Sequence, residues 1–404
     1  MLRLLSASRV RDEATERRAA EIVSGVRRGG DRALKRYAQE LDDLKGPIEI
    51  PRDMWEAKAA ILAAPLRAAI RKAAAHIRRV ARRQAPRPWR LRVAPGISVE
   101  QRVVPLARVG CYVPAGRYPL PSSLLMTAIP ARVTGVAEVV VACPRPDAAV
   151  FAAALEAGVD RLYQMGGAHA IAALAYGTRA IPRADKIVGP GNRWVSAAKA
   201  LVSGDCAIDF YAGPTEILIV TASGSAKWIA ADLLAQAEHD PDARAVLITP
   251  SRRLATAVAR EVEGQMSSSG PARQAITRHG GIIVTRTTEE AMALANLAAP
   301  EHLVVGTEAL ARRVWNAGAV FVGPWTAQVA GDYAIGSNHV LPTAGAARFR
   351  GGLSAADFVK LVSVQRVSRR GLGRIATTIT TLARAEGLEQ HARSIEARVP
   401  KRMP

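Results

Sequence analysis

The sequence lacks the features of secreted, disulfide-stabilised and membrane-spanning proteins. Its 3 cysteines are scattered and odd in number, which argues against a disulfide framework and against a CxxC metal site. It has no apolar run of about eighteen residues, and its N-terminus has no apolar segment followed by a cleavage site. We therefore expect a cytoplasmic protein without a membrane span, in which Cys111, Cys143 and Cys206 are small core residues.

Acidic and aromatic residues are scarce as well. The chain has 35 acidic residues against 56 Lys and Arg, a net charge of +21, and is 4% aromatic. This excess of basic over acidic residues is consistent with either a polyanionic partner or an arginine-rich surface. From Arg67 to Arg92 there are ten Lys and Arg and no acid, yet Ile70, Ala74 and Ile77 repeat at helical spacing. Trp89 is the only aromatic residue in this block, so the block favours a packed helix with a basic outer face over a nucleic-acid surface.

From Val109 onward, short apolar runs alternate with Ala-rich segments of helical period, which is typical of βαβ units. The runs are GCYVP, AEVVVACP, DRLYQMGG and DKIVGPGN, and then TEILIVTA, RAVLITP, GGIIVTR, EHLVVGT and GAVFVGP. Candidate helices near 225–239, 252–266, 288–298 and 308–317 separate the second series of runs. We expect each series to form a parallel sheet covered on both faces.

The domain organisation expected from these patterns has four parts. Residues 1–107 form a helical N-terminal region that leads into the first α/β domain, with a PRP break at 86–88. Residues 108–214 and 215–354 form the two α/β domains. Residues 355–404 form a helical tail without strands, of the kind that often wraps a neighbouring subunit.

The standard dinucleotide fingerprint GxGxxG is missing from both series. Instead, GGAH at 166–169 and GPGN at 189–192 stand at strand ends. Such turns let a ligand approach backbone amides, and a helix that follows them favours phosphate. Glycine also serves turn geometry in proteins that bind nothing there, so both interpretations stay open.

The stretch DLLAQAEHD, from Asp232 to Asp240, places Gln236 and His239 three residues apart at the end of an apolar helical run. Residues at this spacing share a helix face. An amide oxygen and an imidazole on one face form half of a divalent-metal site. The other interpretation is a solvated helix end, since two-ligand patterns are common by accident.

Two further clusters of polar residues lie within otherwise apolar segments of the sequence. They are Glu301-His302 after Pro300, and GDYAIGSNHVLPT from Gly331. An adjacent carboxylate and imidazole can share general acid and base work. Neighbours on a regular strand point to opposite faces, so joint action requires irregular backbone, which the proline permits.

Three other histidines are interpreted structurally. We expect His76, in the basic helix, and His279, in a loop, at the surface. For His339 two roles stay open: hydrogen bonding to a metal ligand, or ordering its own loop.

Taken in order over nearly the whole chain, these motifs resemble the histidinol dehydrogenase family. The matching segments are GCYVPAGRYPLPSS, GGAHAIAALAYGT, KIVGPGN, IDFYAGPTE, DLLAQAEHD, PEHL, GDYAIGSNHVLPT and GLEQH. The resemblance implies a zinc-dependent, NAD-linked enzyme that oxidises L-histidinol through an aldehyde to L-histidine, the last step of histidine biosynthesis. It also implies a homodimer whose subunits have two incomplete Rossmann-like domains and helical end parts, the tail of one subunit completing the active site of the other.

Carried over by position, the resemblance assigns the site residues. One zinc per subunit is bound by Gln236, His239, Asp332 and His391. The substrate contacts these four residues together with Thr215, Glu301, His302 and Glu386. Tyr112, His169 and Asn192 contact NAD.

The resemblance also divides the chemistry between two residues. His302 removes the alcohol proton in the first hydride transfer, and Glu301 activates water for the second. No thiol adduct is required, and the cysteines match no nucleophile of the family.

Three positions depart from the family pattern. Thr215 replaces a usual serine, His169 a usual glutamine and Ala115 a common glycine. They put in doubt the cofactor contact at residue 169 and the substrate. PAGRYP and GPTE also resemble paralogues that oxidise other small alcohols, including a sulfonated diol, whereas PEHL, GDYA and the tail residues favour histidinol. The alternative of another class is a basic nucleic-acid-binding protein on an α/β scaffold.

Overall fold

The computed structural model describes residues 12–114, 120–211 and 213–399, so Ala115 lies outside the described residues. The chain forms two compact units, of which the first holds residues 1–84 and 106–358 and the second holds residues 85–105 and 359–404. Within the described ranges, none of the helices has both the length and the apolar character that a bilayer crossing needs. The boundaries expected at 107, 214 and 354 remain predictions.

The first unit contains a parallel five-stranded sheet in the order β5-β4-β3-β6-β7. Its strands are β3 (Arg108–Tyr112), β4 (Glu138–Ala142), β5 (Arg161–Tyr163), β6 (Lys186–Val188) and β7 (Ala207–Ile208). Val139 and Val141 of β4 pack into one core, and Val140 and Ala142 pack into another. Because side chains alternate across a strand, helices can cover both faces of this sheet.

The helices divide between these two cores. On one face lie α3 (Arg52–Ala60), α4 (Ala64–Gln84), α5 (Pro121–Val133) and α6 (Ala148–Ala157). On the other lie α2 (Glu13–Asp42), which is kinked at Gly30, α7 (Gly167–Tyr176) and α8 (Arg193–Val202). The helix expected in the basic block is α4, and its buried residues are Ile70, Ala74, Ile77 and Ala81. Cys111, Cys143 and Cys206 are buried, as expected.

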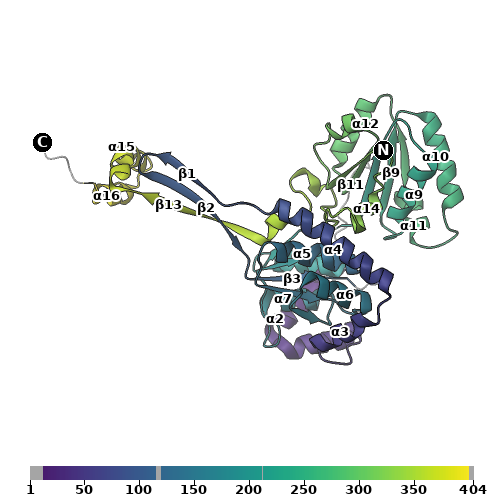
Figure 1. Ribbon diagram of the computed structural model, residues 1–404, viewed down its shortest axis with the longest axis horizontal. Helices are drawn as coiled ribbons and strands as arrows, with labels where there is room; N and C mark the ends of the chain where they lie inside the picture. The colour runs from purple at the N-terminus through teal and green to yellow at the C-terminus, as the bar shows by residue number, and fades with distance from the viewer. Residues whose placement is uncertain (1–11, 115–119, 212, 400–404) are drawn as a thin grey trace. The chain divides into compact units, whose positions relative to one another are not determined.

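A second parallel five-stranded sheet, in the order β10-β9-β8-β11-β12, lies in the same unit. Its strands are β8 (Glu216–Val220), β9 (Arg244–Thr249), β10 (Gly281–Val284), β11 (His302–Val305) and β12 (Ala319–Val322). Its helices are α9 (Ala226–Ala237), α10 (Arg252–Gln265), α11 (Pro271–His279), α12 (Thr288–Ala298), α13 (Glu308–Ala311) and α14 (Gln328–Tyr333). Figure 1 shows α12 on one side of the sheet and α9 and α10 on the other. The prediction of two parallel sheets with helices on both faces is confirmed.

Both sheets have the same strand order. In each, the first strand lies at the centre, with the second and third on one side and the fourth and fifth on the other. This is the 3-2-1-4-5-6 order of dinucleotide-binding folds without its sixth strand. Each sheet is therefore an incomplete version of that fold.

The second unit contradicts two expectations. It contains a three-stranded antiparallel sheet of β1 (Trp89–Ala94), β2 (Ile97–Pro105) and β13 (Val359–Val367), followed by α15 (Arg369–Ala385) and α16 (Glu389–Glu396). The helical region expected to residue 107 and the strandless tail expected from residue 355 are therefore wrong. A period of two is present in WRLRVA, where Arg90 and Arg92 interrupt the apolar residues, whereas VKLVSVQRV has no regular alternation of apolar and polar residues. Pairing of β13 with β2, far away in sequence, stabilises the strand.

His279 also differs from its expected loop position. It is the last residue of α11, a helix that begins with a proline, as helices often do. The segment PARQAITRH buries only Ala275, so its apolar period is too weak to predict a helix. His279 remains near the surface, 3.6 Å from Asp242.

Candidate active site

The candidate active site lies where β8 and β11 begin. Glu301 directly precedes β11 and Thr215 directly precedes β8, and the two strands pair in parallel with His302 opposite Ile217. The register therefore brings Thr215 and Glu301 together. The Thr215 hydroxyl donates to Glu301 Oε2 over 2.6 Å, and the Glu216 amide donates to the same oxygen over 2.9 Å.

The Glu301 carboxyl has an unusual protonation equilibrium. Burial raises its pKa to about 8, and the nearby Asp332 charge acts in the same direction, while the bonds from Thr215 and Glu216 lower it. Burial likewise raises the pKa of Glu216 to about 7, although the Arg244 guanidinium 3.2 Å away lowers it. A carboxyl that titrates near neutral pH can both accept and release a proton during turnover.

His302 has one hydrogen-bonded ring nitrogen and one that has no partner among the described residues. Its Nδ1 lies 3.1 Å from the Glu216 carbonyl oxygen, and since a carbonyl can only accept, Nδ1 carries the proton. Nε2 is buried without a hydrogen-bond partner among the described residues, 4.0 Å from Asp332 Oδ1. Burial lowers the pKa of His302. The ring is therefore a neutral imidazole whose Nε2 can accept a proton.

The irregular backbone expected for joint action of Glu301 and His302 is present. Glu301 lies in a bend before the strand, and Ala299 has a left-handed φ of 50°. His302 Nδ1 and Glu301 Oε2 are 3.6 Å apart. Both side chains thus face the same small region, which a regular strand would prevent.

Gln236, in the last turn of α9, continues this network. Its side chain is 1% exposed, and its Nε2 donates to the Thr215 hydroxyl. The Gln236 amide is thereby oriented, and its Oε1 is buried without a hydrogen-bond partner in the part of the chain that the structure describes. His239 follows in the turn after α9, where it is exposed.

Asp332 approaches the same region from α14. Its Oδ2 accepts from Gln328 Nε2 over 2.9 Å, and its Oδ1 faces His302. His339 Nδ1 lies 3.1 Å from the Asp332 carbonyl oxygen, and its Nε2 lies 3.4 Å from the Ser123 hydroxyl. His339 therefore orders the backbone at Asp332 and lies close to α5, which is the loop-ordering role; hydrogen bonding to the side chain of a metal ligand remains a prediction.

The residues present fit a zinc ion in part. A buried amide oxygen without a partner, as at Gln236, is costly unless something binds it, and nitrogen and oxygen donors suit zinc. In residues 12–114, 120–211 and 213–399, no three His, Cys, Asp or Glu side chains are grouped so as to hold a metal. The predicted ligand His391 and the predicted substrate contact Glu386 belong to the second unit, where both are exposed on or beside α16. The full ligand set remains a prediction.

The predicted cofactor residues lie around the carboxyl end of β3 in the first sheet. Tyr112 ends this strand, and its hydroxyl accepts a hydrogen bond from the Gly167 amide over 3.1 Å. Gly189 has a φ of 115°, and a Cβ there would lie 2.1 Å from the Tyr112 carbonyl oxygen. The GGAH and GPGN turns therefore both adjoin Tyr112, and only glycine fits at residue 189.

His169 and Asn192 make contacts within the protein. His169, 0% exposed in α7, lies with its Nε2 2.8 Å from Asp42 Oδ2. Asn192 caps α8, because its Oδ1 accepts from the amides of Trp194 and Val195. Both residues stabilise turns at the predicted cofactor edge, and their contact with NAD remains a prediction.

Sequence reasoning missed several residues of the two sites. Glu216 is adjacent to Thr215, and Gln328 precedes Asp332 by four residues on one helix, a spacing that could have signalled their contact. Asp42 carried no local signal, since its partners Gly166 and His169 are distant in sequence.

Comparison with known proteins gives concordant matches over nearly the whole chain. The family model for histidinol dehydrogenase matches residues 5–399. The histidinol dehydrogenase of Methylococcus capsulatus is 45% identical, covering 98% of this chain and 94% of its own. That of Thermus thermophilus is 47% identical, covering 96% and 95%. The crystal structure of histidinol dehydrogenase from Elizabethkingia anophelis matches with a TM-score of 0.93 at 32% identity, covering 98% of this chain and 94% of that one.

Proposed function

The chain belongs to the histidinol dehydrogenase family, and we propose that it oxidises L-histidinol through L-histidinaldehyde to L-histidine with NAD. The observation that carries the chemistry is the buried group in which Gln236 donates to Thr215, Thr215 donates to Glu301, and His302 stands beside Glu301. This group places the neutral imidazole of His302 beside the carboxyl of Glu301, whose pKa is near neutrality.

The proton transfers are divided between these two residues. In the first oxidation His302 Nε2 accepts the hydroxyl proton of histidinol. In the second, Glu301 accepts a proton from the water that attacks the aldehyde carbon, so a gem-diol monoanion forms, and loss of a hydride from that carbon leaves the carboxylic acid. When bound, NAD supplies the hydride acceptor for both oxidations. We assign its contacts to Tyr112, His169 and Asn192.

Zinc is the proposed metal, one per subunit, with Gln236, His239, Asp332 and His391 as ligands. When bound, zinc supplies Lewis acidity that orients the substrate's imidazole and amine. Gln236 Oε1, which is buried without a hydrogen-bond partner in residues 12–114, 120–211 and 213–399, supports this assignment. Thr215 and Glu386 complete the substrate contacts. A threonine hydroxyl at residue 215 both donates and accepts here, so this departure from the usual serine keeps the hydrogen-bonding function.

A homodimer with shared sites is the proposed assembly, with the tail supplying Glu386 and His391 to a second copy of this chain. Side chains alternate along the regular part of β1, so Trp89 and Leu91 share one face, with exposed fractions of 47% and 55%. An exposed apolar face of this kind favours a protein partner.

The test of the proposed function is NADH yield per substrate molecule. Two NADH per histidinol are expected, and dialysis against a chelator should abolish the activity, which added zinc should restore. Higher turnover of small diols than of histidinol would favour the paralogue, and full activity in metal-free protein would refute the zinc assignment. For the nucleic-acid alternative, filter binding at two salt concentrations should give only weak binding with a steep salt dependence.

Shared sites are tested by mixing two inactive variants, His239→Ala and His391→Ala, under conditions of subunit exchange. If the tail acts in trans, a mixed dimer has one site with both lesions and one with neither, so part of the activity returns. If the tail acts within its own subunit, every site keeps a lesion, and mixing restores nothing. Demonstrated exchange without recovery would refute the shared site.

A further inference from the structure

A buried ion pair in the first unit is not used by the proposed chemistry. Lys199 of α8 and Asp209, which follows β7, lie with Nζ and Oδ1 2.6 Å apart, and their side chains are 3% and 1% exposed. Burying two charges is costly unless both are paired and hydrogen-bonded, and apolar residues of similar volume often give equal or greater stability. Stability alone therefore does not explain this pair.

Both members of the pair hold the same residue of the GPGN turn. Lys199 Nζ donates to the Gly189 carbonyl over 2.5 Å, and the Gly189 amide donates to Asp209 Oδ2 over 2.7 Å. The Phe210 amide donates to Asp209 Oδ1 over 2.7 Å and fixes the carboxylate in turn. Both polar backbone atoms of Gly189 are thus bound by a rigid, buried group.

Two further contacts fix the 189–192 turn, one at Gly189 and one at its last residue, Asn192. Gly189 rests against the Tyr112 carbonyl in a conformation that only glycine adopts readily. Three residues later, Asn192 caps α8. The turn therefore has fixed ends, and the ion pair is the part that binds its beginning.

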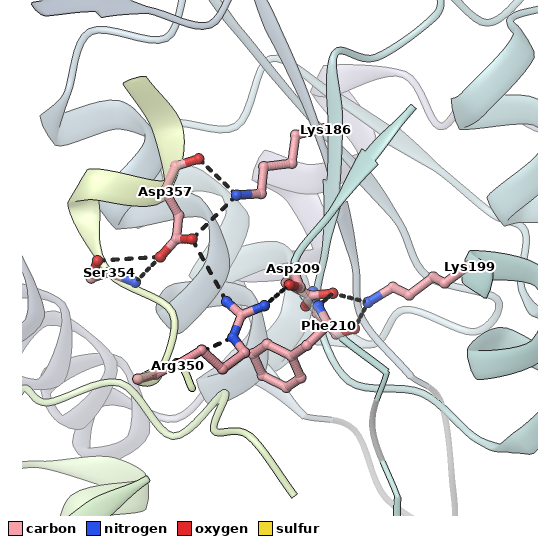
Figure 2. Close-up of polar contacts among 9 residues, drawn as sticks. Lys186, Lys199, Asp209, Phe210, Arg350, Ser354 and Asp357 are labelled. Carbon is pink, nitrogen blue, oxygen red and sulfur yellow. Dashed lines mark hydrogen bonds and ion pairs between the residues drawn. The ribbon is translucent and has the colours of Figure 1, made fainter. Parts of the chain in front are cut away.

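A second layer of charge supports this pair, and Figure 2 shows its labelled side chains. Arg350 Nη1 donates to the Asp209 carbonyl, and its guanidinium lies 4.5 Å from the centre of the Phe210 ring. Arg350 Nη2 is also 3.8 Å from Asp357 Oδ1, and Lys186 Nζ donates to the same oxygen over 3.2 Å. Strand β6 is therefore held by Asp357 at Lys186, its first residue, and by Asp209 at Gly189, just past its last.

We infer that Lys199 and Asp209 are positioning residues for the dinucleotide, because they set the conformation of the 189–192 turn through Gly189. The inference rests on the proposed function, since it takes NAD as the ligand of this edge. The pair itself does not touch the cofactor. Its effect is expected on the binding of NAD and not on the proton transfers at Glu301 and His302.

The experiment compares two double variants in the full-length, zinc-loaded protein. Lys199→Met with Asp209→Leu removes the pair while keeping apolar volume. Arg108→Met with Glu138→Leu, the control, removes an ion pair at the amino ends of β3 and β4 in the same sheet. NADH affinity is measured by fluorescence titration, folding by Tm, and KM separately for NAD and histidinol.

The first variant should bind NADH about tenfold more weakly, equivalent to about 1.4 kcal/mol. KM for NAD should rise in parallel, with KM for histidinol and kcat at saturating NAD changed less than about twofold. The control should bind NADH like wild type. Wild-type affinity in a folded first variant would refute the inference, because the pair would then serve the core alone.

A conservative variant covers the case in which the double variant does not fold. Asp209→Asn keeps volume and an acceptor for Lys199 but places an NH₂ group against the Gly189 amide. The same weakening of NADH binding is expected, and unchanged affinity would again refute the inference. If the wild-type protein did not bind NADH, both the proposed cofactor and the inference would be refuted. If the wild type and the variants bound NADH equally well, only the inference would be refuted.

Discussion

The two sheets of the first unit share one strand order but use opposite edges. In the first sheet the predicted cofactor residues follow strands, at Tyr112 and in the turns at 166–169 and 189–192. In the second sheet Thr215 and Glu301 precede strands. Helices begin at carboxyl edges, so that edge suits phosphate. At the amino edge, the register of neighbouring strands can bring buried carboxyl groups close together. Such groups are suited to proton transfer. In the proposed function, one topology thus serves two kinds of chemistry.

The largest effect expected from the amino edge of the second sheet is that of Glu301→Gln. It should lower the rate of aldehyde oxidation by about 10²- to 10⁴-fold, the usual contribution of a general base. Alcohol oxidation should fall much less, because the proposed mechanism assigns that proton transfer to His302. The two half-reactions are measured separately, with histidinaldehyde and with histidinol as substrate. Equal losses would show that the division between Glu301 and His302 is wrong.

A smaller effect is expected from Thr215→Val, with Thr215→Ser as the matched control. Valine leaves Gln236 Nε2 and Glu301 Oε2 each without one hydrogen bond, so the free energy of unfolding should fall by about 1–3 kcal/mol, and KM for histidinol should rise. Serine keeps the hydroxyl and should behave like wild type in both measurements. A serine variant as impaired as the valine variant would mean that the methyl group, and not the hydroxyl, matters.

The smallest effect is expected at the carboxyl edge of the first sheet. Asn192→Ala removes the cap of α8, which should lower the free energy of unfolding by about 1 kcal/mol. KM for NAD should rise a few-fold while KM for histidinol stays constant. Asn192→Ser, which can still cap, should restore stability. If Asn192→Ala changed KM for histidinol and left KM for NAD unaltered, the assignment of the two edges would be reversed.

Much of this comparison was predictable from the sequence, because nine of the ten strands from β3 to β12 are short apolar runs bounded by turn residues; the two-residue β7 was not predicted. The sequence also placed the glycine turns at strand ends and Glu301-His302 at the start of a strand, as the structure has them. The contacts that could not be predicted join residues that are distant in sequence. The bond between Thr215 and Glu301 depends on the register of β8 with β11, and Lys199 resembles a surface residue of its helix until Asp209 is placed beside it. Strand β13 was missed because its partner β2 is distant in sequence.

The pairing of β13 with β2 has a consequence for how the chain folds during synthesis. The β1–β2 hairpin leaves the ribosome early, whereas β13 follows only after both large sheets have been made. Until then the free edge of β2 can pair with other chains. Arg90 and Arg92 on β1 place positive charge on the hairpin before β13 is made, and such charges oppose edge-to-edge aggregation. We therefore expect part of the arginine excess to protect β2 from pairing with other chains until β13 has been synthesised.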